Sequence, residues 1–217
     1  MKNEISYLNT AELSDFVTIY YRESLHQTIS NQVATTIAII FEAFTQLAQQ
    51  SGPSNVTINA LTKKAGFSRT TFYKYFASIP QLVHQLQEII LFHLDYYSTS
   101  YYHFYTQSDL KSFEQAEKDA TSMMRYFGLF IHDQKFVDQL RQALRLLFER
   151  HLPSFNSPSK DKQYLFKYMK ECFLAYSSDI ILYYYFQKEK ISLEEHLHYA
   201  QIISHELMQI FDKIKRM

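Results

Sequence analysis

The scarcity of helix-breaking residues is the feature that most constrains how this chain folds. Its 217 residues include only 3 glycines and 4 prolines. A β-rich domain of this length needs many tight turns, and such turns draw on glycine and proline. The 18 tyrosines and 18 phenylalanines supply ample apolar area for a core. Together these features predict an all-α fold built from long helices.

Apolar residues recur at helical spacing along most of the chain, and this pattern predicts where the helices lie. The expected helices cover residues 11–27, 31–50, 57–65, 69–76, 78–97, 110–131, 132–151, 159–188 and 192–214. Residues 96–105 are either a loop or a helix extension. The expected helix starts are marked by N-caps at Thr10, Thr57, Ser68 and Ser157 (followed by Pro158), and by capping boxes at Ser78/Gln81 and Ser192/Glu195.

Charge and cysteine content exclude several classes of protein. The 22 basic and 22 acidic residues cancel, so any nucleic-acid surface must be local. A single cysteine, Cys172, rules out a disulfide framework within the chain. The first residues contain no apolar signal segment, and the longest apolar run, from Ile180 to Phe186, is too short to span a bilayer. We therefore expect a soluble, cytoplasmic protein with no membrane association.

The stretch from Val56 to Phe76 carries the clearest functional signal. Its pattern indicates a short helix, a turn containing Gly66 and a second short helix, which is helix-turn-helix spacing. On the second helix Phe72 and Phe76 are four residues apart and point inward. The opposite face, which has no carboxylate, holds Arg69, Thr70, Tyr73 and Lys74. Guanidinium and hydroxyl groups on such a face suit base edges and phosphates in the major groove of DNA.

Local charge agrees with this interpretation. Between Ser30 and Pro80 the single acidic residue is Glu42, and the basic residues are Lys63, Lys64, Arg69 and Lys74. Four bases against one acid leave a net charge of +3 inside a neutral chain. The excess lies where a DNA surface is expected.

The same segment resembles the DNA-binding region of the TetR/AcrR family. In that family a threonine-capped helix leads to an Ala-Gly pair and then to a recognition helix that ends in an aromatic Tyr-x-x-Phe pattern. Here these features are Thr57, Ala65-Gly66 and the run TFYKYF from Thr71 to Phe76, and Leu82 matches the leucine that follows. The resemblance spans about 33–94, and the remainder agrees with the family in length and helical content.

The resemblance implies a three-helix DNA-binding head, and a fourth helix that connects it to a larger helical body. That body usually dimerises through its last two long helices and often holds a small-molecule effector. The implied partners are therefore double-stranded DNA and a second copy of the chain. A dimer would present its recognition helices to successive major grooves of an approximately palindromic operator. Position by position, the implied DNA contacts are Thr57, Asn59, Lys64, Arg69, Thr70, Thr71, Tyr73, Lys74 and Tyr75.

Two departures from the family pattern weaken the expected affinity for DNA. The family usually has a phosphate-contacting lysine at the start of the fourth helix, where this chain has Ile79. Relatives also commonly carry basic residues before or early in the first helix, whereas the stretch from Glu23 to Thr62 contains no lysine or arginine. Each phosphate contact contributes roughly −0.9 to the salt-dependence slope, so binding should be weaker and less salt-sensitive than is usual.

Several groups of residues admit either a functional or a packing interpretation. One hypothesis places an effector pocket between helices of the body, lined by Met123, Met124, Phe127, Phe148, Phe173 and Tyr176. The tyrosine-rich stretches at 96–105 and 183–185 favour packing over ligand binding. Cys172 is expected to be a buried structural thiol, and the nine histidines show no metal-ligand spacing.

The final two helices carry apolar residues on more than one face, which favours a four-helix dimer interface over a purely internal core. These residues are Phe166, Met169, Phe173, Ile180, Ile181, Tyr184, Leu197, Ile202, Leu207 and Ile210.

We therefore expect three segments: an N-terminal extension helix within 1–27, a DNA-binding head in 28–80, and a regulatory and dimerisation body in 81–217. The main functional hypothesis is a ligand-responsive transcriptional repressor. The alternative is a co-activator or adaptor, derived from a helix-turn-helix protein, that acts mainly through protein contacts. No nucleophile, metal or phosphate-loop signature points to an enzyme or to a cofactor.

Overall fold

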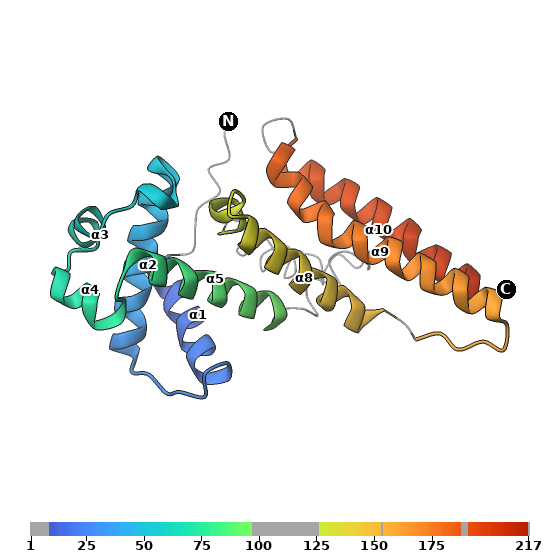
Figure 1. The fold of residues 1–217 in the computed structure, drawn as a ribbon, viewed down its shortest axis with the longest axis horizontal. Coiled ribbons are helices and arrows are strands. Elements are labelled where there is room, and N and C mark those ends of the chain that lie inside the picture. Colours follow the sequence, from blue (N-terminus) through green and yellow to red (C-terminus); the bar gives the residue numbers. More distant parts are fainter. Residues whose placement is uncertain (1–8, 97–125, 153, 188–190, 217) are drawn as a thin grey trace. The chain divides into compact units, whose positions relative to one another are not determined.

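The computed structural model describes residues 9–96, 126–152, 154–187 and 191–216, and within these ranges it contains helices and no strand. The predicted all-α fold is therefore confirmed. The helices, labelled in Figure 1, are α1 (Thr10–Glu23), α2 (Asn31–Ser51), α3 (Ile58–Ala65), α4 (Arg69–Tyr75), α5 (Ile79–Tyr96), α8 (Gln134–His151), α9 (Lys160–Gln187) and α10 (Leu193–Arg216), with a short 3-10 turn at Pro53–Asn55. No helix in the described part of the chain is both long and apolar enough to cross a membrane.

Most helix starts follow the predicted caps. The hydroxyls of Thr57 and Ser68 accept hydrogen bonds from backbone N–H groups three residues on, in α3 and α4. At α10, Ser192 and Glu195 form the expected reciprocal capping box. At α5 only half of the predicted box is present, because Gln81 accepts from the backbone N–H of Ala77 instead of returning to Ser78.

Two predicted caps are wrong. Helix α1 is capped by Asn9, not Thr10, since the Asn9 amide oxygen accepts from the backbone N–H groups of Ala11 and Glu12. The Thr10 hydroxyl instead donates to the carboxylate of Glu42 on α2. Pro158 lies two residues before the first residue of α9 and is not in its first turn. The residue that caps α9 is Ser159, whose hydroxyl accepts from the backbone N–H of Lys162.

The described residues divide into two compact units. The first holds residues up to Leu94 and 126–133; the second holds Asp95, Tyr96 and the residues from Gln134 on. In the first unit, α1 and α2 form a helical hairpin, and α2 also packs against α3, which contacts α4. Its core includes Phe41, Phe44, Phe72 and Phe76, all at most 1% exposed.

In the second unit α9 is the central helix, since both α8 and α10 pack against it. Aromatic rings connect the three helices. The ring centroids of Phe148 and Phe173 lie 5.9 Å apart, and those of Phe173 and Phe211 also lie 5.9 Å apart. Ion pairs join α8 to α9 at the surface, and these are Arg141–Asp179, Arg145–Glu171 and Lys170–Glu149.

Part of the predicted helix at 110–131 lies outside the described residues, as does most of the tyrosine-rich stretch at 96–105. The described end of that helix, residues 126–130, is helical and largely buried. Tyr126, Phe127 and Phe130 are each at most 2% exposed.

Candidate nucleic-acid interface

Helix α3 is fixed at both ends by local interactions. The hydroxyl of Thr57 accepts from the backbone N–H of Ala60 at 3.2 Å, and this cap begins the helix. Gly66 ends it in the left-handed conformation, with φ of 72°, which an L residue with a Cβ adopts at a cost. Between these ends Leu61, 1% exposed, anchors α3 to the core. The turn predicted at Gly66 is therefore present.

Helix α4 is held by its buried aromatic side chains. Phe72 and Phe76 are each 1% exposed, and their ring centroids lie 5.7 Å apart. The Phe76 ring also lies 5.7 Å from the ring of Phe41 on α2. Truncating a buried phenylalanine typically costs about 3–5 kcal/mol, so these contacts fix the position of a helix of only 7 residues. The predicted inward orientation of both phenylalanines is confirmed.

The opposite face of α4 is open to solvent. Arg69, Thr70, Tyr73 and Lys74 are all exposed, and the Tyr73 side chain is 55% exposed. Of the other predicted contacts, the exposed ones are Thr57, Asn59 and Lys64, and the half-buried ones are Thr71 and Tyr75. The hydroxyls of Thr71 and Ser68 lie 3.0 Å apart, and Lys74 Nζ lies 5.6 Å from the centroid of the Tyr75 ring.

The surface formed by α3 and α4 carries positive charge without nearby acid. Lys63 and Lys64 are exposed in the last turn of α3, and Arg69 and Lys74 are exposed on α4. Glu42, the single acid between residues 30 and 80, lies half-buried on α2, where it accepts hydrogen bonds from Thr10 and Gln46. The cationic surface therefore keeps its charge.

One hydrogen bond across the turn was not anticipated from the sequence. The guanidinium of Arg69, the first residue of α4, donates through Nε to the amide oxygen of Asn59 on α3, at 2.6 Å. The Nη2 group donates to the same oxygen. The two residues are 10 apart in the chain, and no local periodicity links them. The resemblance predicted both as separate contacts.

The two departures from the family pattern lie at the first residues of α2 and α5. Ile79 is half-buried as the first residue of α5. The first turn of α2 exposes Asn31 and Gln32, which are neutral, and its N-cap is Ser30. None of these residues carries a positive charge.

The predicted effector-pocket residues pack as core where they are described. Met123 and Met124 lie outside the described residues. Phe127, Phe148 and Phe173 are fully buried, and the half-buried Tyr176 donates its hydroxyl to the Ala200 carbonyl at 3.2 Å. Burial raises the pKa of the Tyr176 hydroxyl, and its hydrogen bond with Ser204 partly offsets that rise.

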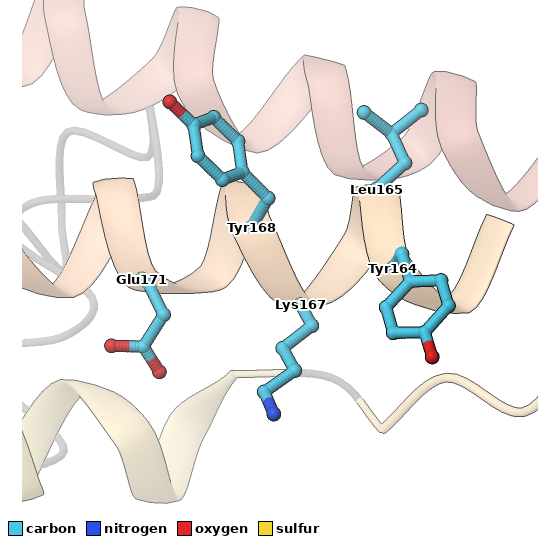
Figure 2. A pocket seen from close by; sticks show the side chains of 5 residues that line it. All are labelled: Tyr164, Leu165, Lys167, Tyr168 and Glu171. Atoms are coloured by element: carbon cyan, nitrogen blue, oxygen red, sulfur yellow. The ribbon is translucent and has the colours of Figure 1, made fainter. Parts of the chain in front are cut away.

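A shallow pocket of about 510 Å³ lies on the outer surface of α9 and shares no residue with the predicted set. Figure 2 shows the five exposed side chains that line it: Tyr164, Leu165, Lys167, Tyr168 and Glu171. One turn beyond Tyr168, Cys172 is also exposed. The predicted burial of this thiol is therefore wrong for the single chain, because the apolar neighbours that suggested it, Phe173 and Leu174, are the buried ones.

Among the described residues no group of three or more His, Cys, Asp or Glu side chains could hold a metal ion. The arrangement that does stand out is a short, well-anchored helix that exposes an arginine, a lysine and hydroxyl groups. Such a surface can bind the phosphates and base edges of a nucleic acid.

Comparison with known proteins supports this reading of the surface. Residues 40–86 match the family model described as bacterial regulatory proteins, tetR family. No curated protein and no solved structure matches the chain. The matched segment runs from the middle of α2 through α3 and α4 into α5, and so contains the whole helix-turn-helix. Residues 40–86, which make up less than half of the chain, are therefore similar to the DNA-binding segment of TetR-family regulators.

Proposed function

We propose that the chain is a cytoplasmic repressor that binds an approximately palindromic operator as a homodimer and releases it on binding a small effector. The observation that carries this proposal is the exposed face of α4, which is cationic, free of acid and anchored from behind by Phe72 and Phe76. A rigid helix placed in this way can enter a major groove without reorganising.

We assign the DNA contacts to the residues on and beside that face. Arg69, Thr70 and Tyr73 are the candidates for base edges, because they lie on the exposed side of α4. Thr57, Lys64 and Lys74, with the half-buried Thr71 and Tyr75, are candidates mainly for phosphate, and Asn59 lies within hydrogen-bond distance of Arg69. The proposed head is residues 28–80, and the proposed body is residues 81–217.

The proposed dimer rests on exposed apolar residues of the second unit. Along α9, Leu165, Tyr168, Cys172 and Ala175 recur at spacings of three and four, and all are exposed. On α10 the exposed apolar residues Tyr199, Ile202 and Ile203 lie to one side of the buried positions, while His198, His205, Gln209 and Asp212 lie to the other. We call these seven apolar or small residues of α9 and α10 the outer stripe. A helix pair with such a stripe favours packing against an identical pair.

Effector control would require two head arrangements with different affinities for the operator. Of the predicted effector pocket, Phe148, Phe173 and Tyr176 pack among α8, α9 and α10. Effector binding there would have to displace well-packed side chains. This part of the proposal rests on the family resemblance.

A protein adaptor is the second candidate function. It is favoured by the absence of lysine and arginine between Glu23 and Thr62, and by Ile79 at a position where the family usually has lysine. Such a protein would retain the head but bind DNA too weakly to act alone.

The deciding experiment is enrichment of double-stranded DNA by the purified dimer from sheared genomic fragments of its own organism. We expect one or a few enriched fragments that share an inverted repeat, with half-sites about 34–36 Å apart. No enrichment at low salt, from protein shown to be folded, would contradict the repressor and favour the adaptor.

A further inference from the structure

We propose that Asn59 and Arg69 act as one unit that reads a guanine in the major groove, with Asn59 as the positioning residue. This inference rests on the proposed operator binding and names the base that one part of the surface recognises. It begins from the hydrogen bonds between the Arg69 guanidinium and the Asn59 amide oxygen, which join α4 to α3 across the turn.

The donors left on this pair define what it can bind. A guanidinium has five N–H donors, and Arg69 uses one on Nε and one on Nη2 for Asn59. Its outer edge keeps an N–H on each Nη nitrogen, which lie side by side. Asn59 uses its oxygen as the acceptor, so its NH₂ group remains as two further donors. The pair therefore offers only donors to a ligand.

Guanine is the base that matches such a surface. Its major-groove edge presents the O6 and N7 acceptors side by side, and no donor. Adenine and cytosine place an amino donor in the same groove, and this donor would face the donors of the pair. Arg69 is the first residue of α4, and N-terminal residues of a recognition helix reach base edges. Thymine presents a single acceptor, O4, beside a methyl group, so it cannot pair with both outer N–H groups of Arg69. A phosphate also offers only acceptors, and the experiment below separates it from guanine.

The partner of Arg69 also matters for its charge. Asn59 is neutral, so it orients the guanidinium without neutralising it, as a carboxylate would. Both side chains are exposed, and an arginine in solvent otherwise samples many rotamers. Holding it in one geometry before binding lowers the entropy lost in the complex.

The test uses the full-length chain and a duplex selected by the wild-type protein from a randomised double-stranded DNA pool. We expect a guanine at one fixed position in each half-site. Replacing that guanine with 7-deazaguanine removes the N7 acceptor and should weaken wild-type binding on the order of tenfold. Replacing it with inosine keeps O6 and N7, and should change the affinity by less than about twofold.

Protein variants test the pairing itself. Asn59→Ala should weaken binding on the order of fivefold in the wild-type background and have no effect in the Arg69→Ala background, because the residue it positions is gone. Thr70→Ala is the matched control: Thr70 lies beside Arg69 and is exposed, and the effect of Asn59→Ala should persist in that background. Circular dichroism should show all variants folded, since each changed side chain is exposed.

Three other outcomes would contradict the pairing of the two residues, the contact with guanine, or the operator binding. Independent effects of Asn59→Ala and Arg69→Ala would show that the residues do not act together. Equal binding of guanine and 7-deazaguanine duplexes, with a smaller salt dependence for Arg69→Ala, would assign Arg69 to a phosphate. A wild-type protein that selects no duplex would contradict the proposed operator binding itself.

Discussion

At the scale of single residues, His93 is the group whose chemistry is most altered by the fold. It is 0% exposed on α5, its ring stacks on that of Phe16 with centroids 4.0 Å apart, and its Nε2–H donates to the Phe16 carbonyl at 2.9 Å. Burial lowers the pKa of His93 to about 4, and the hydrogen bond to Phe16 partly offsets that effect. The folded protein therefore favours the neutral imidazole.

This shift predicts a pH dependence of stability. Between the unfolded pKa of 6.5 and the folded pKa of about 4, the unfolded chain binds more protons at this site, so the free energy of unfolding falls as the pH drops through that window. The full change for a shift of this size is about 3 kcal/mol. Urea unfolding at pH 7 and pH 5 should show a smaller loss for His93→Phe than for the wild type. Both proteins keep the other eight histidines, and parallel losses would contradict the prediction.

The sequence allowed the anchoring residues to be predicted, but not the pairs that form across elements. Gly66, Phe72 and the Thr57 cap each follow from a local rule of spacing or backbone conformation, and each lies where it was expected. The bond from Arg69 to Asn59 and the burial of His93 against Phe16 depend on how separate helices approach one another. One sequence contains no signal for that approach.

At the scale of elements, α1 is a helix of the first unit that lies wholly outside the family match. The match begins at residue 40, whereas α1 ends at Glu23. Helix α1 packs on α2 and contacts α5 through Gln85, whose Nε2 donates to the Tyr21 hydroxyl at 2.7 Å, and through the Phe16–His93 stack. Helix α1 therefore contacts both α2 and α5. These contacts give α1 a packing role in the first unit.

This docking predicts that α1 contributes to the stability of the head. Leu13 is 2% exposed and lies on the buried face of α1 with Val17 and Tyr20, so Leu13→Ala should lower the free energy of unfolding by about 2–5 kcal/mol. Leu25, just beyond α1, is 39% exposed and supplies the control, because Leu25→Ala should change stability by no more than about 0.5 kcal/mol. Urea titrations followed by circular dichroism measure both. Equal midpoints for wild type and Leu13→Ala would mean that α1 is not docked in solution.

The helix boundaries show which element-scale features can be derived from sequence. Periodicity located α2, α3, α4, α5, α8, α9 and α10 to within about two residues at each end. At α1 the predicted end was wrong, because the helix ends at Glu23 and not near Gln27. The caps of α1 and α9 were assigned to the wrong residues, since several residues there could serve as cap. Choosing between neighbouring caps depends on tertiary contacts, such as that of Thr10 with Glu42.

At the scale of the whole molecule, the outer stripe of α9 and α10 is the feature that a single chain leaves unexplained. Tyr168 is 68% exposed, and Ile202 and Ile203 are 48% and 43% exposed. Scattered exposed apolar residues are common, but a continuous stripe along two packed helices marks an interaction surface. Figure 1 shows α9 and α10 running side by side along their length, and the stripe covers residues 165–175 of α9 and 199–203 of α10.

A homodimer through this stripe predicts that charge placed within it separates the subunits. Tyr168→Glu combined with Ile203→Glu should convert the dimer to a monomer in sedimentation experiments while leaving the helical content unchanged, because both side chains are exposed in the single chain and buried carboxylates are costly in an interface. Leu146→Glu, at a 47% exposed position on α8 outside the stripe, is the matched control and should remain dimeric.

The reactivity of the Cys172 thiol provides a second measurement of the same interface. It lies on the stripe between Tyr168 and Ala175 and is exposed in the single chain. A dimer interface would shield it, so a thiol reagent should react slowly with the wild-type dimer and at least about tenfold faster with the Tyr168→Glu, Ile203→Glu monomer. Equal reaction rates in a wild-type protein shown to be dimeric would move the interface away from this stripe. A monomeric wild type would remove the basis for a palindromic operator, because one recognition helix reads one half-site.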